Sequence, residues 1–93
     1  MKAIHPGRVL RRELESRKMS ANALALALRT PSGRIVDILN RKRGISPETA
    51  LRLARFFGNS AIFWLNHQTA YELAVAEEAL GKRIAEEVKP AAA

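Results

Sequence analysis

Residues 20–40, SANALALALRTPSGRIVDILN, decide how this chain of 93 residues is expected to fold. Two short apolar runs lie on either side of the segment 29–31. In both runs large aliphatic residues recur at spacings of three or four, which places their side chains on one face of a helix. These residues are Leu24, Leu28, Ile35, Ile38 and Leu39. The stretch therefore predicts two short amphipathic helices separated by a tight turn.

Residues that favour the start of a helix precede both runs. Ser20 and Thr30 each carry a side-chain oxygen that can accept a hydrogen bond from the free N–H groups of a first helical turn. Pro31 falls at or next to the first position of the second helix, where a missing N–H costs little. Two short helices joined by a turn of about three or four residues form a helix-turn-helix, whose second helix enters the major groove of DNA.

Three further helices are expected around this unit, over about residues 6–18, 46–58 and 60–80. Ser46 and Ser60 stand where N-caps belong, and Gly58 stands where a C-cap belongs. The residues expected to face inward from the first two of these helices are Val9, Leu10, Leu14, Ala50, Leu53, Ala54 and Phe57. Alternating β-branched runs and hairpin turn signals are missing, so the predicted fold class is all-α with no sheet.

The last helix is apolar on more than one side, because its apolar residues are too widely spread for one stripe. We interpret the extra face as a dimer interface, shared with a protein partner. The residues assigned to this dimer or partner interface are Phe63, Trp64, His67, Tyr71 and Leu73. The alternative is a two-sided helix wedged entirely within its own bundle.

Gly81 is expected to break this last helix. Residues 82–89 would extend it only weakly, and residues 90–93 would be frayed. We therefore divide the chain into a helix-turn-helix domain with its dimerisation helix, residues 1–81, and a weakly helical to frayed tail, residues 82–93.

Charge is distributed unevenly along the chain. Residues 1–58 hold thirteen Lys or Arg against four acids, a balance of +9, and residues 59–93 hold three against five, a balance of −2. A basic N-terminal part and a mildly acidic C-terminal part of the chain indicate a polyanionic partner that binds one side of the protein only. The alternative is a well-solvated surface without a partner.

Arg34 is the best candidate for reading a base, since its guanidinium can bind guanine O6 and N7 together. Asp37 could accept from a cytosine amino group or hold Arg34 in place, and the alternative is an Arg34–Asp37 pair within the helix and without a DNA role. Gly33 would let the backbone approach DNA closely, or else it marks a loose helix start. The full set of predicted DNA-binding residues is Ser20, Asn22, Arg29, Thr30, Ser32, Gly33, Arg34, Asp37, Arg41, Lys42 and Arg43.

Four blocks of the sequence resemble the Xre, or phage-repressor, helix-turn-helix family and specifically its HigA-type antitoxins. The blocks are HPGRVLRREL, SANALALAL, RIVDILNRKRGISPETALRLARFFG and FWLNHQTAYELAVA. The resemblance implies a five-helix lambda-repressor-like bundle with a long C-terminal helix. It also implies a homodimer that represses its own operon at an inverted repeat of double-stranded operator DNA. The expected partner is a HigB/RelE-like mRNA endonuclease toxin, docked on the first or last helix and neutralised there.

The sequence departs from the family pattern at three positions. An arginine replaces the usual acidic residue at Arg8, and arginines replace the usual glycine at Arg29 and Arg41. At the position of Arg29 the chain in this family tends to take a left-handed conformation, which costs a residue other than glycine on the order of 1 kcal/mol. Either the turn is built differently in this chain, or something that Arg29 does offsets the strain. We hypothesise that Arg29 contacts a DNA phosphate.

Several classes of function are not expected. The only histidines, His5 and His67, lie far apart in the sequence, and P-loop, dinucleotide-binding and HExxH motifs are missing. We therefore expect no enzyme, no catalytic or metal site and no cofactor. No apolar run approaches the ~20 residues of a membrane span, and the lack of cysteine suits a reducing cytoplasm.

Two other functions stay open. One is a stand-alone Xre-type transcriptional regulator without a toxin partner. The other is a helical interaction module whose basic face binds an acidic protein or RNA.

Overall fold

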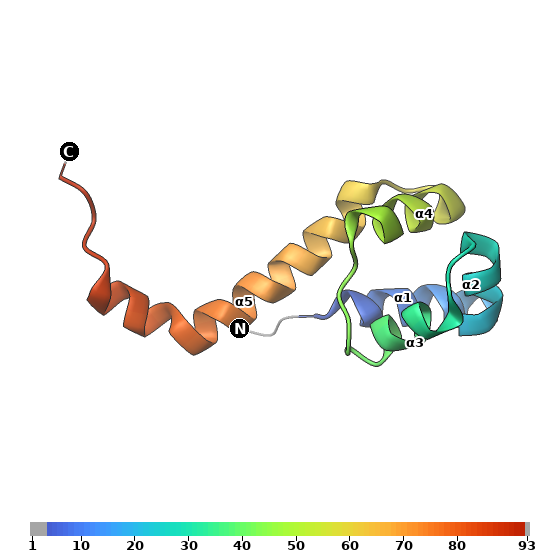
Figure 1. The fold of residues 1–93 in the computed structure, drawn as a ribbon, viewed down its shortest axis with the longest axis horizontal. Coiled ribbons are helices and arrows are strands. Elements are labelled where there is room, and N and C mark those ends of the chain that lie inside the picture. The colour runs from blue at the N-terminus through green and yellow to red at the C-terminus, as the bar shows by residue number, and fades with distance from the viewer. Residues whose placement is uncertain (1–3, 93) are drawn as a thin grey trace.

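The computed structural model describes residues 4–92. This part of the chain forms five helices and no strands (Figure 1), as the fold class predicted from the sequence requires. The helices are α1 Pro6–Arg17, α2 Ala21–Leu28, α3 Ser32–Leu39, α4 Pro47–Phe57 and α5 Ala61–Glu87. Residues 1–3 and 93, the ends of the predicted domain and tail, lie outside the described residues.

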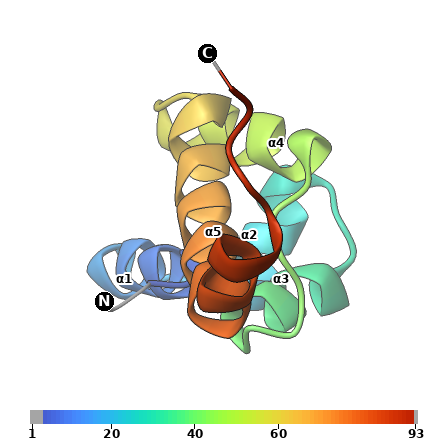
Figure 2. The same cartoon turned by 90° about the vertical axis from the view of Figure 1, so that its left-hand side faces the viewer.

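The five helices form a bundle with one long projection (Figure 1). Helices α1 to α4 and the first part of α5 pack together, and the rest of α5 extends away from them. Figure 2 looks along the projecting end of α5 toward the bundle. The molecule consequently measures 52 Å along its longest axis and 24 by 22 Å across the other two. No helix within residues 4–92 is both long and apolar enough to pass through a lipid bilayer.

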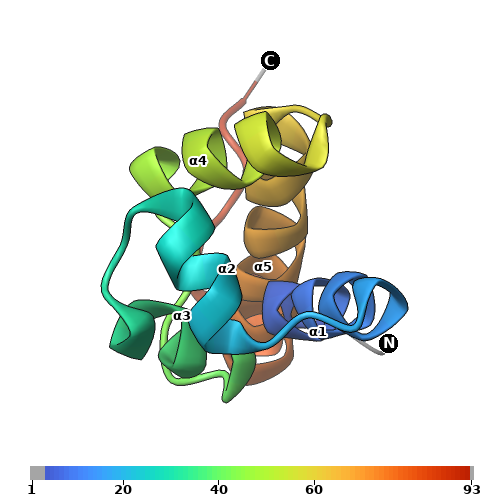
Figure 3. The ribbon, with the colours of Figure 1, turned by 90° about the vertical axis from the view of Figure 1, so that its right-hand side faces the viewer.

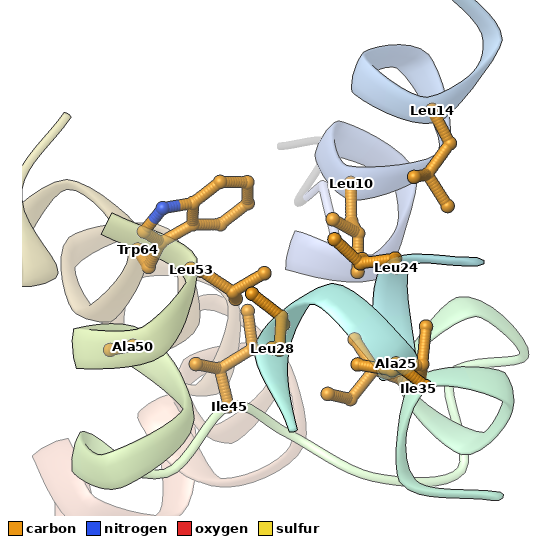
Figure 4. Close-up of a cluster of buried hydrophobic side chains, with 11 residues drawn as sticks. Leu10, Leu14, Leu24, Ala25, Leu28, Ile35, Ile45, Ala50, Leu53 and Trp64 are labelled. Atoms are coloured by element: carbon orange, nitrogen blue, oxygen red, sulfur yellow. The ribbon is translucent and has the colours of Figure 1, made fainter. Parts of the chain in front are cut away.

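One aliphatic core joins all five helices (Figure 4). Leu10 of α1, Leu24 of α2 and Leu53 of α4 are completely buried, and so are Ile35 and Ile38 of α3. Burying each such side chain contributes about 1.5–3 kcal/mol. The inward faces predicted for these helices from residue spacing are therefore confirmed.

Trp64 corrects the interface prediction for the last helix. Its side chain is completely buried in the core of its own chain, where Figure 4 shows it near Leu53. The indole Nε1 donates a hydrogen bond of 2.9 Å to Asn59 Oδ1. We therefore remove Trp64 from the proposed interface, because it has no surface left to offer a partner.

Side-chain caps fix the starts of three helices as the sequence predicts. The hydroxyls of Ser20, Ser46 and Ser60 accept from backbone N–H groups three residues later, at 3.0, 3.3 and 3.0 Å. Gly58 ends α4 in the left-handed conformation with φ 78°. Each cap of this kind stabilises its helix by about 1 kcal/mol.

The start of α3 differs from the prediction. Pro31, and not Thr30, occupies the N-cap position, and α3 begins at Ser32. Thr30 lies one residue too early to cap the helix, and its Oγ1 is buried without a hydrogen-bond partner among residues 4–92. The hydroxyl that was expected to cap α3 is therefore buried and does not cap the helix.

Gly81 does not break the last helix. It lies inside α5, which continues to Glu87. A glycine inside a helix costs about 1 kcal/mol relative to alanine. The surrounding residues are good helix formers, and Arg83 pairs with Glu87 at 3.1 Å one turn apart. The helix therefore continues through the glycine.

The N-terminus of α1 lies against the C-terminus of α3 because Gly7 has no side chain. A Cβ atom at Gly7 would lie 2.0 Å from the backbone oxygen of Ile38. His5, the N-cap of α1, is also buried here, and its Nδ1 accepts from Gly7 N at 2.9 Å. The imidazole packs edge-on against Tyr71 of α5, with ring centroids 4.8 Å apart. His5 thus ties α1 to α5, a role that the sequence did not reveal.

The His5 cap requires a neutral imidazole, because the accepting Nδ1 cannot carry a proton. Burial lowers the pKa of His5 below its ordinary value of 6.5, and the positive charge of Arg41 lowers it further.

We predict that the free energy of unfolding falls as the pH drops below about 6.5. The unfolded chain then takes up a proton at His5 before the folded chain does, so acid favours unfolding until the folded imidazole also protonates. His5→Asn keeps an N-cap without a titrating group and should remove this part of the pH dependence. Urea unfolding of the wild type and the variant at about pH 5.5 and 7.5 measures this pH dependence. Equal pH dependence in the two proteins would contradict the assignment to His5.

Candidate nucleic-acid interface

Helices α2 and α3 form a helix-turn-helix. Figure 3 shows both helices in front of α5, with α4 above them. Helix α2 ends at Leu28, and α3 begins four residues later at Ser32. Arg29 makes the turn in the left-handed conformation, with φ 59° and ψ 46°. Its N–H donates to Leu26 O at 3.2 Å, and the N–H of Thr30 donates to Ala25 O at 3.0 Å. The left-handed geometry expected at Arg29 is therefore confirmed.

Helix α3 buries one face and exposes the other. Ile35 and Ile38 are completely buried. Ser32 and Gly33 are exposed at its start, and Arg34 is half-buried. Apart from Gly33 itself, its chain neighbours and the adjacent backbone of α3, no atom of the described residues lies within 4 Å of the place where a Gly33 Cβ would stand. Both the close-approach and the loose-start interpretations therefore stay open.

The N-terminus of α3 differs from the other helix starts. Pro31 provides no side-chain hydrogen bond, whereas His5, Ser20, Ser46 and Ser60 each cap their helix. The first N–H groups of α3 therefore have no capping side chain. Such groups favour anions through hydrogen bonding and the helix dipole.

Val36 is an outward residue that the sequence reasoning missed. It is 41% exposed, between the buried Ile35 and Ile38. The signal was present in the spacing, since residue 36 falls at the edge of the stripe formed by Ile35, Ile38 and Leu39. An aliphatic side chain here can contact the methyl group of thymine.

The loop after α3 holds three adjacent cations, Arg41, Lys42 and Arg43, all exposed. Arg41 has φ 61°, so a second arginine occupies a left-handed position. Arg43 Nε lies 3.9 Å from Asp37 Oδ2, in a pair that is about half exposed on both sides. Exposed pairs of this kind contribute about 0–1 kcal/mol.

The partner of Asp37 is therefore Arg43 and not Arg34, which differs from the intrahelical pair considered from the sequence. Among residues 4–92, Arg34 makes no ion pair. Its guanidinium consequently stays available to a base or a phosphate.

Gln68 of α5 anchors the loop after α3. Its Oε1 accepts from the N–H of Ile45 at 2.9 Å. Gly44 leaves room for this contact, because a Cβ there would lie 2.6 Å from Gln68 Nε2. Ile45 itself is buried in the core. The cationic loop is therefore held at its far end by the long helix.

The remaining predicted residues divide between the start of α2 and the long helix. Ser20 caps α2, and Asn22 beside it is exposed. On α5, Phe63 and Leu73 are 37% and 63% exposed. His67 Nδ1 lies 2.9 Å from Phe63 O. Within residues 4–92, no three His, Cys, Asp or Glu side chains cluster in a way that could hold a metal ion.

Known proteins match this fold closely. A family model described as helix-turn-helix matches residues 10–65. Virulence-associated protein I of Dichelobacter nodosus is 53% identical over 79 residues, 84% of this chain and 73% of that protein. An addiction module antidote protein of the HigA family from Coxiella burnetii is 50% identical with a TM-score of 0.94, over 98% of this chain and 100% of that one. Antitoxin HigA of Pseudomonas aeruginosa, solved with the higBA promoter, is 44% identical with a TM-score of 0.94. The match covers 98% of this chain and 100% of that one.

The bundle contains two short helices, α2 and α3, joined by a tight turn, and α3 exposes one face. This arrangement defines a helix-turn-helix protein. The chain belongs to the helix-turn-helix family and, within it, to the HigA-type antitoxins. The family resemblance drawn from the sequence blocks is thereby confirmed. This family consists of DNA-binding antitoxins and regulators and not of enzymes.

We predict that Arg29→Gly stabilises the chain and weakens DNA binding. Glycine removes the left-handed strain, which is worth about 1 kcal/mol. Loss of a phosphate contact should reduce the salt dependence of DNA affinity by about one ion per protomer. Urea unfolding measures the first effect, and fluorescence anisotropy on a random-sequence duplex at several salt concentrations measures the second.

Lys18→Gly is the matched control, because Lys18 is also left-handed, with φ 53°, but was not assigned to the interface. It should stabilise the chain similarly without changing DNA affinity. If Arg29→Gly also leaves the affinity and its salt dependence unchanged, Arg29 contacts no phosphate.

Proposed function

We propose that this chain is a homodimeric antitoxin that binds an inverted repeat in its own promoter, represses its operon and neutralises a HigB/RelE-like mRNA endonuclease. The observation that carries the proposal is the position of Arg34 on α3, half-buried, without an ion-pair partner among residues 4–92 and between two cationic turns. The family relationship supports it, because the Pseudomonas aeruginosa relative was solved with the higBA promoter.

Helix α3 would lie in the major groove. Arg34 would read guanine through O6 and N7, and Val36 would meet a thymine methyl group. Asp37 would orient Arg43 and accept from a cytosine amino group where one is within reach. The phosphates on either side would contact Arg29 and the loop 41–43, while Ser20, Asn22, Ser32 and Gly33 complete the interface. Thr30 is removed from the predicted set, because its hydroxyl is buried.

Dimerisation follows from the length of the recognition helix. One eight-residue α3 covers only a few base pairs, so two copies must read half-sites about 34 Å apart. The outer part of α5 offers a surface for pairing. Leu73, Leu80 and Ile84 are 63%, 43% and 51% exposed, and spacings of seven and four residues place them on one helical face. Phe63, His67 and Tyr71 lie nearer the bundle on the same helix.

The toxin partner is inferred from family membership. The Coxiella burnetii relative is an addiction module antidote protein. We propose that the toxin docks on a folded surface of the antitoxin, on α1 or α5. An adjacent reading frame for a small basic protein would support this partner over the stand-alone regulator.

Arg34→Ala should weaken binding to the promoter DNA upstream of the chain's own reading frame by about 1–3 kcal/mol. It should have little effect on a random duplex of equal length, because a base contact contributes only at the correct site. Fluorescence anisotropy at one fixed salt concentration measures both affinities. Arg55→Ala, which removes an exposed arginine from α4, is the control. Equal losses on both duplexes would make Arg34 a phosphate contact, and equal wild-type affinity for both would refute operator recognition.

Leu80→Glu should convert the dimer into a monomer and weaken binding to a two-half-site duplex, on the order of 10²-fold. A charge in the centre of a paired apolar face is costly to bury. Light scattering at about micromolar concentration measures the mass. Val75→Glu is the control, since Val75 is 47% exposed on the same helix but outside the Leu73–Leu80–Ile84 face. A monomeric wild-type protein would contradict the dimer.

A further inference from the structure

A surface hollow of about 420 Å³ lies between α1 and the end of α3, and only Arg41 of its lining residues belongs to the set of DNA-binding residues predicted from the sequence. Arg8 and Arg11 of α1 line one side of it. Leu39, Asn40 and Arg41 line the other side. The hollow therefore brings together three arginines from two parts of the chain that are separated by about thirty residues.

None of the three guanidinium groups forms an ion pair among residues 4–92. Within residues 4–92, the acidic groups that form ion pairs are bound to Arg17, Arg43, Arg52 and Arg83. Of the three arginines, Arg11 donates a hydrogen bond of 3.4 Å from its Nη2 to Leu39 O. Like charges placed this close repel one another, so an anion between them would be bound favourably.

The backbone conformation of Arg41, the third arginine of the hollow, supports a functional role for its side chain. Arg41 holds a left-handed φ of 61°, where a glycine would be unstrained. Its positive charge also reaches the buried His5 and lowers the pKa of that imidazole. Arg41, at the start of the cationic loop, therefore occupies a strained backbone position and places a positive charge near His5.

We propose that this hollow binds a phosphate group of the DNA backbone, held by Arg8, Arg11 and Arg41. Guanidinium groups match phosphate oxygens in geometry and charge and keep their charge at every physiological pH. DNA is favoured over an acidic protein because the hollow adjoins the loop that directly follows the recognition helix. The inference rests on the DNA-binding function proposed above and extends the contact from the helix-turn-helix onto α1.

The test combines Arg8→Gln with Arg11→Gln and measures anisotropy on the promoter duplex and on a shuffled duplex of equal length. Loss of one phosphate contact per protomer should reduce the slope of log affinity against log salt concentration by about one per protomer. Both duplexes should lose affinity by the same factor, since a phosphate carries no sequence information. Arg12→Gln, in the same helix and outside the hollow, should leave the slope unchanged.

Arg41→Gly provides a second variant that relieves backbone strain, so that weaker DNA binding cannot be ascribed to misfolding. It should melt no lower than the wild type and still show the reduced slope. In addition, inorganic phosphate should raise the melting temperature of the wild type more than chloride at equal ionic strength, and this difference should shrink in the Arg8/Arg11 variant.

Three outcomes would overturn the inference. The first is an unchanged slope in both variants while the wild type still binds the promoter duplex. The second is equal stabilisation of the wild type by phosphate and chloride. The third is intact DNA binding with loss of binding to the product of the neighbouring reading frame, which would assign the hollow to an acidic protein surface. Absence of DNA binding by the wild type would instead refute the proposed function itself.

Discussion

The surface proposed to face DNA depends on the close approach of α1 to the end of α3. Gly7 permits it, because any side chain there would collide with the carbonyl group of Ile38. The same approach buries the His5 cap and brings two arginines of α1 beside the loop that follows α3. One backbone contact thus sets the position of the recognition helix and gathers positive charge next to it.

Backbone strain is concentrated at both ends of α3. Arg29 and Arg41 hold left-handed conformations at the turn before the helix and in the loop after it. Each costs about 1–2 kcal/mol relative to glycine, which is substantial in a small domain whose total stability is typically about 5–15 kcal/mol. The conformation at Arg29 was predictable from the family pattern, since a turn of this shape normally contains glycine. The strain places cations on either side of the helix that is proposed to enter the groove.

The long helix connects the two halves of the proposed function. Gln68 holds the cationic loop, and Tyr71 packs against the His5 cap of α1. Farther along the same helix, Leu73 and Leu80 are exposed. Pairing through that outer face would therefore set the distance between two recognition helices through one rigid element. Through the Gln68 hydrogen bond, it would also connect any partner bound to α5 with the loop that is proposed to contact DNA.

The sequence by itself determined the five helices, most of their inner faces and the helix-turn-helix, because caps and residue spacing act within a few residues of the chain. Only the tertiary structure decided that Trp64 faces inward, because spacing identifies an apolar face without telling which neighbour covers it. It also decided that α5 continues through Gly81, where helix-forming neighbours outweigh one glycine. The pairing of Asp37 with Arg43 and the gathering of arginines beside α3 depend on packing between distant segments. No local pattern encodes such contacts.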